Sequence, residues 1–280
     1  MNCLSEIDLD APDFGDLYDE LPLWSAPFGL LLLDRIPVRP DLTILDIGAG
    51  TGFLTLELAQ RCGPGSKVIA VDPWNAGMNR LRRKLGHLGL TNVVLLEQDA
   101  EALDLPDASI DVIVSNLGIN NFNNADAVLR ACFRVAKPNA MFFLTTNLVG
   151  HMAEFYEVYR ATLLELGRSD WLAALDAHIS HRGTVDSVGG MLEAAGFNVL
   201  HIATDTFRMR FADGSSLLHH YFIRLGFVPA WKSIVMADSL QKTFEILEAK
   251  LNAVAATRGE LALTIPIACV EACKKTGVTR

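Results

Sequence analysis

The chain has 280 residues, half of them hydrophobic, so it is long enough to bury a full core and too apolar for a disordered protein. Its net charge is -9, but seven acidic residues lie among the first twenty, which leaves the remainder near neutral and argues against a nucleic-acid partner. The longest apolar run near the N-terminus, residues 28–33, falls far short of the ~20 residues that span a bilayer, and no basic segment of a secretion signal precedes it.

Residues 1–36 are expected to form an N-terminal arm followed by a short helix. The acidic first twenty residues are interrupted by glycine and proline, so we expect most of this arm to be loosely held, with Phe14, Tyr18 and Trp24 as apolar anchors. Residues 28–35 are predicted to form a short buried helix that the next proline ends.

The segment 43–52 predicts a buried strand that runs into a glycine-rich turn and then a helix. Its apolar run, Ile44-Leu45 and Ile47, is too short for a helix, which suits a parallel strand covered on both faces. The glycines that follow permit positive φ and let the backbone pass close to a ligand where a Cβ atom would collide.

The spacing of these glycines separates two kinds of nucleotide-like ligand. Dinucleotide-binding proteins carry G-x-G-x-x-G, with a helix N-terminus facing a pyrophosphate. Here the pattern is Gly48-x-Gly50-x-Gly52, and Asp46 precedes it by two residues. A carboxylate repels a phosphate and attracts an ammonium or sulfonium, so the turn favours a cationic ligand.

Residues 68–72 predict a second buried strand that ends on an acid. Asp72 lies 24 residues after Gly48, close to the separation at which a carboxylate meets a ribose diol in nucleotide-binding βαβ units. Pro73 and Trp74 follow and are candidates to lie against an adenine face. The next helix carries the chain's basic cluster, which we expect to be a solvated face: Arg80, Arg82, Arg83 and Lys84.

Further strands are predicted at 93–96, 110–116 and 141–146. The loop after the strand 110–116 is rich in asparagine, and it lies where open α/β sheets bind ligands, at the carboxyl end of a strand. Its asparagines are Asn116, Asn120, Asn121, Asn123 and Asn124.

These motifs resemble those of the class I S-adenosylmethionine (SAM)-dependent methyltransferases, in the family's order, over residues 40–147. The resemblance is carried by Leu45-Asp46-Ile47-Gly48-Ala49-Gly50-Thr51-Gly52, Asp72, Asp99, residues 110–116 and Lys137-Pro138. The turn after Lys137-Pro138 departs from the family, because Asn139 and Ala140 stand where it has glycines. The segments 99–109 and 117–121 look most like the small-molecule branch, which includes quinone C-methyltransferases and carboxyl O-methyltransferases.

The resemblance implies a doubly wound, Rossmann-like α/β fold whose seventh strand is antiparallel, with SAM as cofactor and S-adenosylhomocysteine as product. It implies that Asp99 receives the adenine amino group beside the backbone of Ala100, although Asp99 also suits a helix N-cap. It likewise implies that Tyr18 folds over the cofactor, with simple packing of the arm as the alternative. The cofactor-binding residues so predicted are Tyr18, Asp46, Gly48, Ala49, Gly50, Asp72, Pro73, Asp99, Ala100 and Asn116.

Residues 37–280 are predicted to form the methyltransferase domain, interrupted by helical insertions at 150–183 and 213–257. Each insertion carries an apolar helical stripe, so we expect both to join in one lid that builds the acceptor pocket. The last strand, within 261–272, contains Pro266, which cannot donate to a ladder, so a bulge or a missing bond is expected there.

Candidate acceptor contacts are drawn from the arm, the asparagine loop and the insertions: Trp24, Asn120, Asn121, His151, His220, Arg208 and Arg210. The histidines also suit packing or surface positions, and the alternating segment 207–211 also suits an exposed strand with snorkelling arginines. No metal site is predicted, because no metal-binding histidine or cysteine spacing is present. No catalytic residue is assigned, because a sulfonium already activates the methyl group and positioning supplies much of the rate.

The sequence therefore predicts a SAM-dependent methyltransferase that modifies an oxygen or a carbon of a small molecule. The alternatives are an NAD(P)-dependent Rossmann oxidoreductase, against which the glycine spacing argues, and a SAM-binding protein without catalysis. Its cysteines form no Cys-x-x-Cys pair and lie in apolar patterns, which predicts reduced core residues of a cytoplasmic protein: Cys3, Cys62, Cys132, Cys269 and Cys273.

Overall fold

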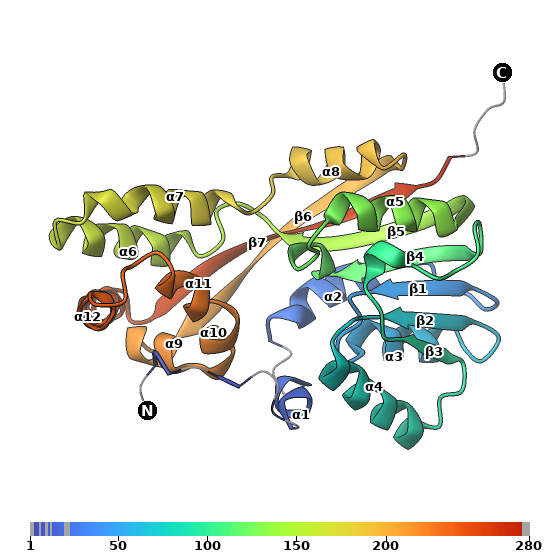
Figure 1. The fold of residues 1–280 in the computed structure, drawn as a ribbon, viewed down its shortest axis with the longest axis horizontal. Coiled ribbons are helices and arrows are strands. Elements are labelled where there is room, and N and C mark those ends of the chain that lie inside the picture. The colour runs from blue at the N-terminus through green and yellow to red at the C-terminus, as the bar shows by residue number, and fades with distance from the viewer. Residues whose placement is uncertain (1–2, 6, 9–10, 12, 20–22, 276–280) are drawn as a thin grey trace. The chain divides into compact units, whose positions relative to one another are not determined.

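The computed structural model describes residues 3–5, 7–8, 11, 13–19 and 23–275, and the chain divides into two compact units (Figure 1). We call them the sheet unit, formed by Asp10–Thr146, Thr184–Asp205 and Ile267–Arg280, and the helical unit, formed by Met1–Leu9, Asn147–Gly183 and Thr206–Pro266. None of the described helices is both long and apolar enough to cross a membrane.

A mixed sheet of seven strands organises the fold, in the order β3-β2-β1-β4-β5-β7-β6. The predicted antiparallel last strand is confirmed, and it lies between β5 and β6. Parallel pairing is recorded for β1 with β2 and β4, for β2 with β3, and for β4 with β5. The strands are β1 Thr43–Ile47, β2 Lys67–Val71, β3 Val93–Leu96, β4 Ile110–Asn116, β5 Ala136–Asn147, β6 Asn198–Phe211 and β7 Leu261–Cys273.

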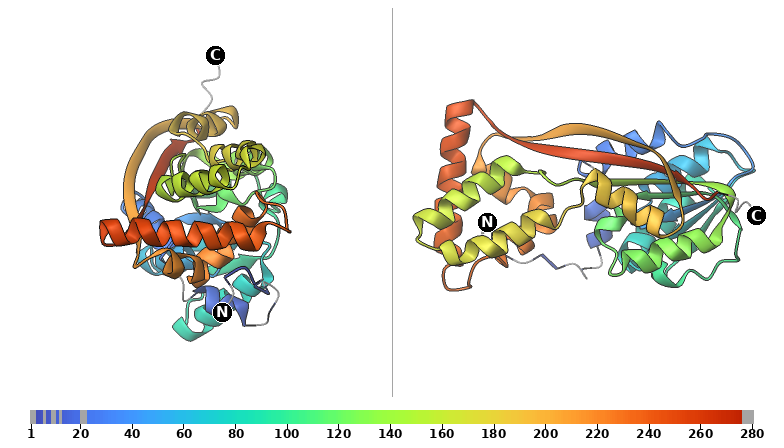
Figure 2. Two further views of the ribbon diagram at one scale, coloured as in Figure 1. Left: turned by 90° about the vertical axis from the view of Figure 1, so that its left-hand side faces the viewer. Right: turned by 90° about the horizontal axis from the view of Figure 1, so that it is seen from above.

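Helices cover both faces of the sheet unit (Figure 2), because successive residues of its buried strands point to opposite sides. Leu45 and Ile47 of β1 belong to the core beneath α5 and α8, whereas Ile44 belongs to the core beneath α2 and α3. Asp46 therefore lies on the same side as Ile44, toward α3. The helices of this unit are α1 Phe14–Asp19, α2 Ser25–Leu33, α3 Phe53–Arg61, α4 Asn75–Leu88, α5 Ala125–Val135 and α8 Val185–Ala194, with 3-10 turns η1 Ala100–Ala102 and η2 Gly118–Asn120.

The N-terminal arm differs from the expectation of a loosely held segment, because α1 packs on α4. Asp19 accepts hydrogen bonds from Arg80 at 2.9 Å and from Lys84 at 2.7 Å. The basic cluster of α4 is thus not simply a solvated face, since its charges complement those of the acidic arm. The rings of Phe14 and Tyr18 add apolar contact with Trp74, at centroid distances of 5.7 and 5.1 Å.

The helical unit contains both predicted insertions in full. Its helices are α6 Ala153–Glu165, α7 Leu172–Ser180, α9 Gly214–His219, α10 Tyr221–Gly226, α11 Val228–Lys232 and α12 Leu240–Arg258, with the 3-10 turn η3 Ser169–Trp171. Large rings form its core: Phe155 stacks on Trp231 at 3.9 Å, and the Tyr159 hydroxyl donates to the Trp231 carbonyl at 2.8 Å. The apolar stripes of the insertions therefore bury one another within this unit.

The last strand runs continuously through Pro266, where the chain passes from the helical unit to the sheet unit. The Pro266 carbonyl accepts a hydrogen bond from the amide of Leu148 at 3.0 Å. The bulge or missing bond expected at this proline stays a prediction.

The departure at Asn139 has a simple conformational explanation. Asn139 has φ of +65°, the left-handed region where the family's glycine is unstrained and where asparagine is tolerated better than most residues. Its amide donates to the Lys274 carbonyl at 2.7 Å, which joins this turn to the end of β7. The substitution therefore preserves the backbone geometry of the turn.

We predict that Asn139→Ala lowers the free energy of unfolding by about 1 kcal/mol, because alanine at positive φ is strained, whereas Asn139→Gly leaves it nearly unchanged. Urea unfolding of both variants measures the difference. Equal stability of the two variants would contradict this explanation of the turn.

Candidate functional site

The glycine loop joins β1 to α3 at the carboxyl end of the parallel strands. Its backbone amides are engaged within the protein: Gly48 and Ala49 donate to the Val71 carbonyl at 2.9 and 3.2 Å, Gly52 donates to Ala49, and Gly50 donates to the Asp72 carboxylate at 2.8 Å. A pyrophosphate binds such a loop through free amides at the helix N-terminus. The amides of Gly48, Ala49, Gly50 and Gly52 are therefore not available to a pyrophosphate.

Two of these glycines have positive φ and different surroundings. A Cβ atom on Gly48, which has φ of +75°, would lie 3.1 Å from the Cα atom of Gly118. At Gly50, which has φ of +52°, a Cβ atom would meet nothing within 4 Å. The backbone at Gly50 thus borders open space in which a ligand can approach it closely.

Asp72 closes the second side of the loop. Its carboxylate accepts from the Gly50 amide and, at 2.8 Å through its other oxygen, from the Trp74 amide. Burial raises the pKa of Asp72, and these two hydrogen bonds oppose that rise. Each carboxylate oxygen keeps a further lone pair, so ribose hydroxyls can donate to Asp72 without displacing either amide.

Asp46 is the most deeply buried acid of the site, with 1% of its surface exposed. The hydroxyl of Thr55, in the first turn of α3, donates to it at 2.6 Å. Burial raises the pKa of Asp46 to about 7, with a further rise from the negative charge of Asp72 and an opposing effect of Thr55. A cation at this loop would relieve both the desolvation and the repulsion.

The predicted adenine contacts lie at η1, and the predicted contact Asn116 lies at the end of β4. Asp99 caps η1 by accepting from the Glu101 amide at 2.9 Å, and Ala100 beside it is buried. The cap role of Asp99 is therefore confirmed, and its second oxygen leaves the adenine role open as a prediction. Asn116 accepts from Thr145 and donates to the Ser25 carbonyl at 3.1 Å, so it ties α2 to this edge.

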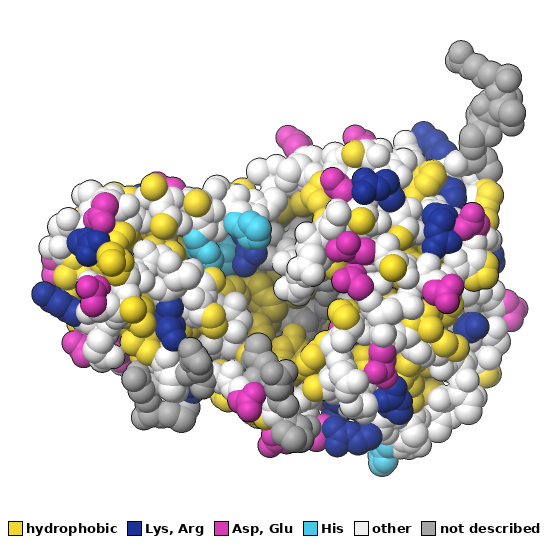
Figure 3. Space-filling view, in the orientation of Figure 1, with side chains coloured by type: hydrophobic (Ala, Val, Ile, Leu, Met, Phe, Trp, Pro, Cys, Tyr) yellow, Lys and Arg dark blue, Asp and Glu magenta, His cyan; other side chains and the backbone are white. Residues whose placement is uncertain are grey.

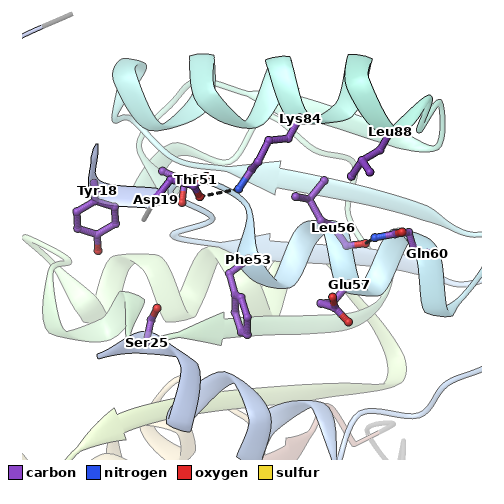
Figure 4. A pocket seen from close by; sticks show the side chains of 10 residues that line it. All are labelled: Tyr18, Asp19, Ser25, Thr51, Phe53, Leu56, Glu57, Gln60, Lys84 and Leu88. Carbon is purple, nitrogen blue, oxygen red and sulfur yellow. Dashed lines mark hydrogen bonds and ion pairs between the residues drawn. The ribbon is translucent and has the colours of Figure 1, made fainter. Parts of the chain in front are cut away.

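A pocket of about 280 Å³ lies beside the glycine loop, between α3 and α4 (Figure 4). Tyr18 and Asp19 of the arm and Thr51 of the loop line one part of it, and Leu56 and Leu88 line another. Neither Asp72 nor Asp99 is among its lining residues. It is thus a hollow next to the predicted ribose and adenine contacts and not the same space.

Comparison with known proteins decides the family. A family model described as a methyltransferase domain matches residues 39–196, which is more than half of the chain and includes every motif above from Asp46 to Lys137. The chain belongs to the class I SAM-dependent methyltransferases. Its cofactor is therefore SAM.

Curated relatives of this methyltransferase include the ubiquinone/menaquinone biosynthesis C-methyltransferase UbiE of Salmonella arizonae, 29% identical over 175 residues, which cover 59% of this chain and 70% of that protein. Among solved structures, YcgJ of Bacillus subtilis matches with a TM-score of 0.59 at 17% identity, covering 90% of this chain and 100% of that one. Phosphoethanolamine N-methyltransferase 2 of Haemonchus contortus, solved with S-adenosylhomocysteine, matches with a TM-score of 0.57 at 16% identity. The match covers 96% of this chain and 59% of that one. The solved structures support the fold.

The acceptor candidates of the methyltransferase divide between the units. Trp24, Asn120 and Asn121 belong to the sheet unit, where Asn120 accepts from the Thr146 hydroxyl at 2.7 Å and Trp24 packs on Phe28. The others belong to the helical unit: His151, His220, Arg208 and Arg210. His151 is buried there, and His220 contacts the ring of Phe211.

The segment 207–211 has the geometry of an exposed strand. Arg208 and Arg210 are exposed, whereas the intervening Met209 is partly buried, as alternation along β6 requires. Arg210 forms an ion pair with Glu260 at 2.5 Å. This arrangement favours the snorkelling interpretation for Arg210 over a role as an acceptor anchor.

Sequence reasoning missed several partners in the methyltransferase. Thr55 could have been found, because it lies in the first turn of the helix after the loop, on the side of Asp46. The pairing of Asp19 with α4 had a signal in the opposite charges of the arm and that helix. Tyr156, His178 and Arg182 of the helical unit carried no signal, since Tyr156 lies beside the predicted stripe and the other two lie near a helix end. No group of potential metal ligands occurs among the described residues.

We predict that Asp46→Asn stabilises the cofactor-free protein at pH 8. The raised pKa means that stability of the wild type falls as pH rises from the ordinary aspartate range to about 7, where the buried carboxyl ionises. Because each pKa unit corresponds to ~1.4 kcal/mol, the advantage of the variant should grow by about 2 kcal/mol between pH 5.5 and pH 8. Urea unfolding at both pH values measures this, and a pH-independent difference would show that Asp46 does not titrate in this range.

We also predict that Gly15→Ala detaches α1 from α4. A Cβ atom at Gly15 would lie 2.5 Å from the Ala76 carbonyl oxygen, a backbone atom that cannot move aside easily. Limited proteolysis should cleave the arm about tenfold faster, the equivalent of ~1.4 kcal/mol of lost docking free energy. Leu17→Ala, at an exposed position of the same helix, is the control and should leave the rate unchanged.

Proposed function

We propose that this methyltransferase transfers a methyl group from SAM to an oxygen or a carbon of a small molecule in the cytoplasm. The observation that carries the cofactor half of the proposal is the pair Asp46 and Asp72 beside a loop whose amides are already bonded. Such a site favours a ligand with positive charge and hydroxyl donors and disfavours one with phosphates. The name of the UbiE relative supports a small-molecule acceptor.

The residues of the sheet unit would each have a separate task. Asp72 would accept from the ribose hydroxyls, and Asp99 with the amide of Ala100 would bind the adenine. Asp46, ionised when a cation is present, would stabilise the positive end of the cofactor through the loop. Tyr18, close enough for the charge of Asp72 to raise its pKa, would close the site from the arm.

The cofactor supplies an activated methyl group, so the protein's remaining work is to bind the acceptor in line and to exclude water. We propose that the helical unit does this, as the lid predicted from residues 150–183 and 213–257. The support is its polar interior, since His151 is buried beside the rings of Tyr156 and Phe227. The cytoplasmic location is supported by the cysteines, all of which are free thiols.

The test is the affinity of the protein for S-adenosylhomocysteine, measured by calorimetry. Asp72→Ala should weaken binding by about 1.5–3 kcal/mol, the range for hydrogen bonds to a charged group. Asp107→Ala is the matched control, because that carboxylate is exposed and pairs with Arg134 at the surface. Transfer of labelled methyl from SAM to a small molecule of a cell extract should accompany binding.

Unchanged affinity in Asp72→Ala, or tighter binding of NAD than of S-adenosylhomocysteine, would contradict the proposed site. Normal cofactor binding with no labelled product in any extract fraction would favour the SAM-binding protein without catalysis.

A further inference from the structure

Polar side chains from separate elements meet inside the helical unit. Tyr156 comes from α6, His178 from α7 and Trp231 from α11, while His151 and Arg182 lie next to α6 and α7. Figure 3 shows histidine side chains beside a basic side chain on the surface over the end of α7. The glycine loop and its carboxylates take no part in this cluster, which belongs to the helical unit alone.

The hydrogen bonds of this cluster fix the Tyr156 hydroxyl. The Trp231 ring nitrogen donates to the Tyr156 oxygen at 3.3 Å, because an indole nitrogen can only donate. The same oxygen lies 3.0 Å from Nε2 of His178. Trp231 is held in turn by stacking on Phe155 at 3.9 Å. The position of the Tyr156–His178 pair is therefore fixed by Trp231, which is itself packed against Phe155.

Arg182 is the charged group of the cluster. Burial and the positive charge of Arg182 lower the pKa of His178, and burial lowers the pKa of His151 to about 3, so both rings are neutral at pH 7. Burial raises the pKa of Tyr156, whose hydroxyl stays protonated. Arg182 thus brings one positive charge into a group of neutral rings.

The acids on the neighbouring elements are engaged elsewhere. Asp176 of α7 pairs with Arg160, Glu154 of α6 accepts from Thr264, and Asp170 of η3 pairs with Arg168. Glu157 of α6 is exposed, and Lys232 of α11 donates to the Leu4 carbonyl. Within the described part of the chain, the buried Nε atom of Arg182 has no hydrogen-bond partner. Arg182 is close enough to Tyr156, His151 and His178 for its charge to affect their pKa values. A half-buried guanidinium with an unused donor in this position is suited to an anion that arrives from outside.

We infer that Arg182, His178 and Tyr156 form the recognition site for the methyl acceptor, and that this acceptor is an organic oxyanion, either a carboxylate or the conjugate base of an acidic phenol or enol. The guanidinium binds the negative oxygen, and the hydrogen-bonded Tyr156–His178 pair supplies one further donor. That donor is the Tyr156 hydroxyl when Nε2 of His178 carries the ring proton, and Nδ1 of His178 when Nδ1 carries it. That this anion is the methyl acceptor rests on the proposed function, whereas the anion site itself is argued from residues of the helical unit alone. An oxyanion is also a competent methyl acceptor without a general base.

The experiment titrates the full chain with benzoate and with 4-nitrophenolate, using benzamide as the neutral isostere, and follows binding by calorimetry and by the ring NMR signals of His178. We expect both anions or one of them to bind and benzamide to bind far more weakly. Preference between benzoate and 4-nitrophenolate distinguishes a carboxylate from a phenolate acceptor. Arg182→Met should weaken anion binding about tenfold or more, and Arg182→Lys should restore part of it.

Arg160→Met is the matched control, because Arg160 lies on the same pair of helices and pairs with Asp176 at the surface. It should leave anion binding within about twofold of wild type, a difference below ~0.5 kcal/mol. Tyr156→Phe, which removes only a hydroxyl, should weaken anion binding less than Arg182→Met does. This variant keeps the proposal testable should Arg182→Met fail to fold.

The inference is overturned if neither anion binds, if benzamide binds as well as benzoate, or if folded Arg182 and Tyr156 variants bind the anions like wild type. Affinity for S-adenosylhomocysteine is measured on the same samples and should be unchanged by Arg182→Met. If the wild type binds the anions through Arg182 but does not bind S-adenosylhomocysteine, the proposed function is overturned and the anion site stands. Cofactor binding without anion binding would do the reverse.

Discussion

The rest of this site depends on Asp46, a carboxylate that is buried without a counter-charge. Asp46 lies between the apolar residues Leu45 and Ile47 of β1, and its recorded partner is the Thr55 hydroxyl. Desolvation alone would keep it neutral, and the charge of Asp72 pushes in the same direction. An acid in this position weakens the empty protein and strengthens the complex with a cation, so its presence is understandable only in the bound state.

The backbone of the glycine loop also disfavours an anionic ligand. Because its amides donate to Val71, Ala49 and Asp72, the loop presents a closed hydrogen-bond network to the ligand and not a row of free donors. The left-handed backbone at Gly48 and Gly50 is what allows the chain to turn back on β2 and make these bonds. Charge and loop geometry thus both disfavour a phosphate beside residues 48–50, and they depend on Asp46 and Asp72 together with the carbonyl of Val71.

The sheet unit could be predicted from the sequence to a large extent, because its information is local. Short apolar runs ending on Asp72 or Asn116 specify parallel strands, and the glycine spacing specifies the turn. The docking of the arm was harder to predict, since it depends on pairing Asp19 with side chains of α4 about sixty residues away in the sequence, and opposite charge was its signal. The cluster around Tyr156 was equally inaccessible, because Trp231 reaches it from a distant helix and no periodicity encodes such a meeting.

The two charge environments suggest how an enzyme of this kind can keep its substrates apart. Asp46 and Asp72 make the sheet unit attractive to a cation and repulsive to an oxyanion. Arg182 gives the helical unit the opposite preference, in surroundings that desolvate its charge. Each substrate is then excluded from the other's site by repulsion as well as selected by contact, and discrimination of this kind does not require a tight fit. The lowered pKa values of His151 and His178 keep both rings neutral, so Arg182 is the charged group of this cluster.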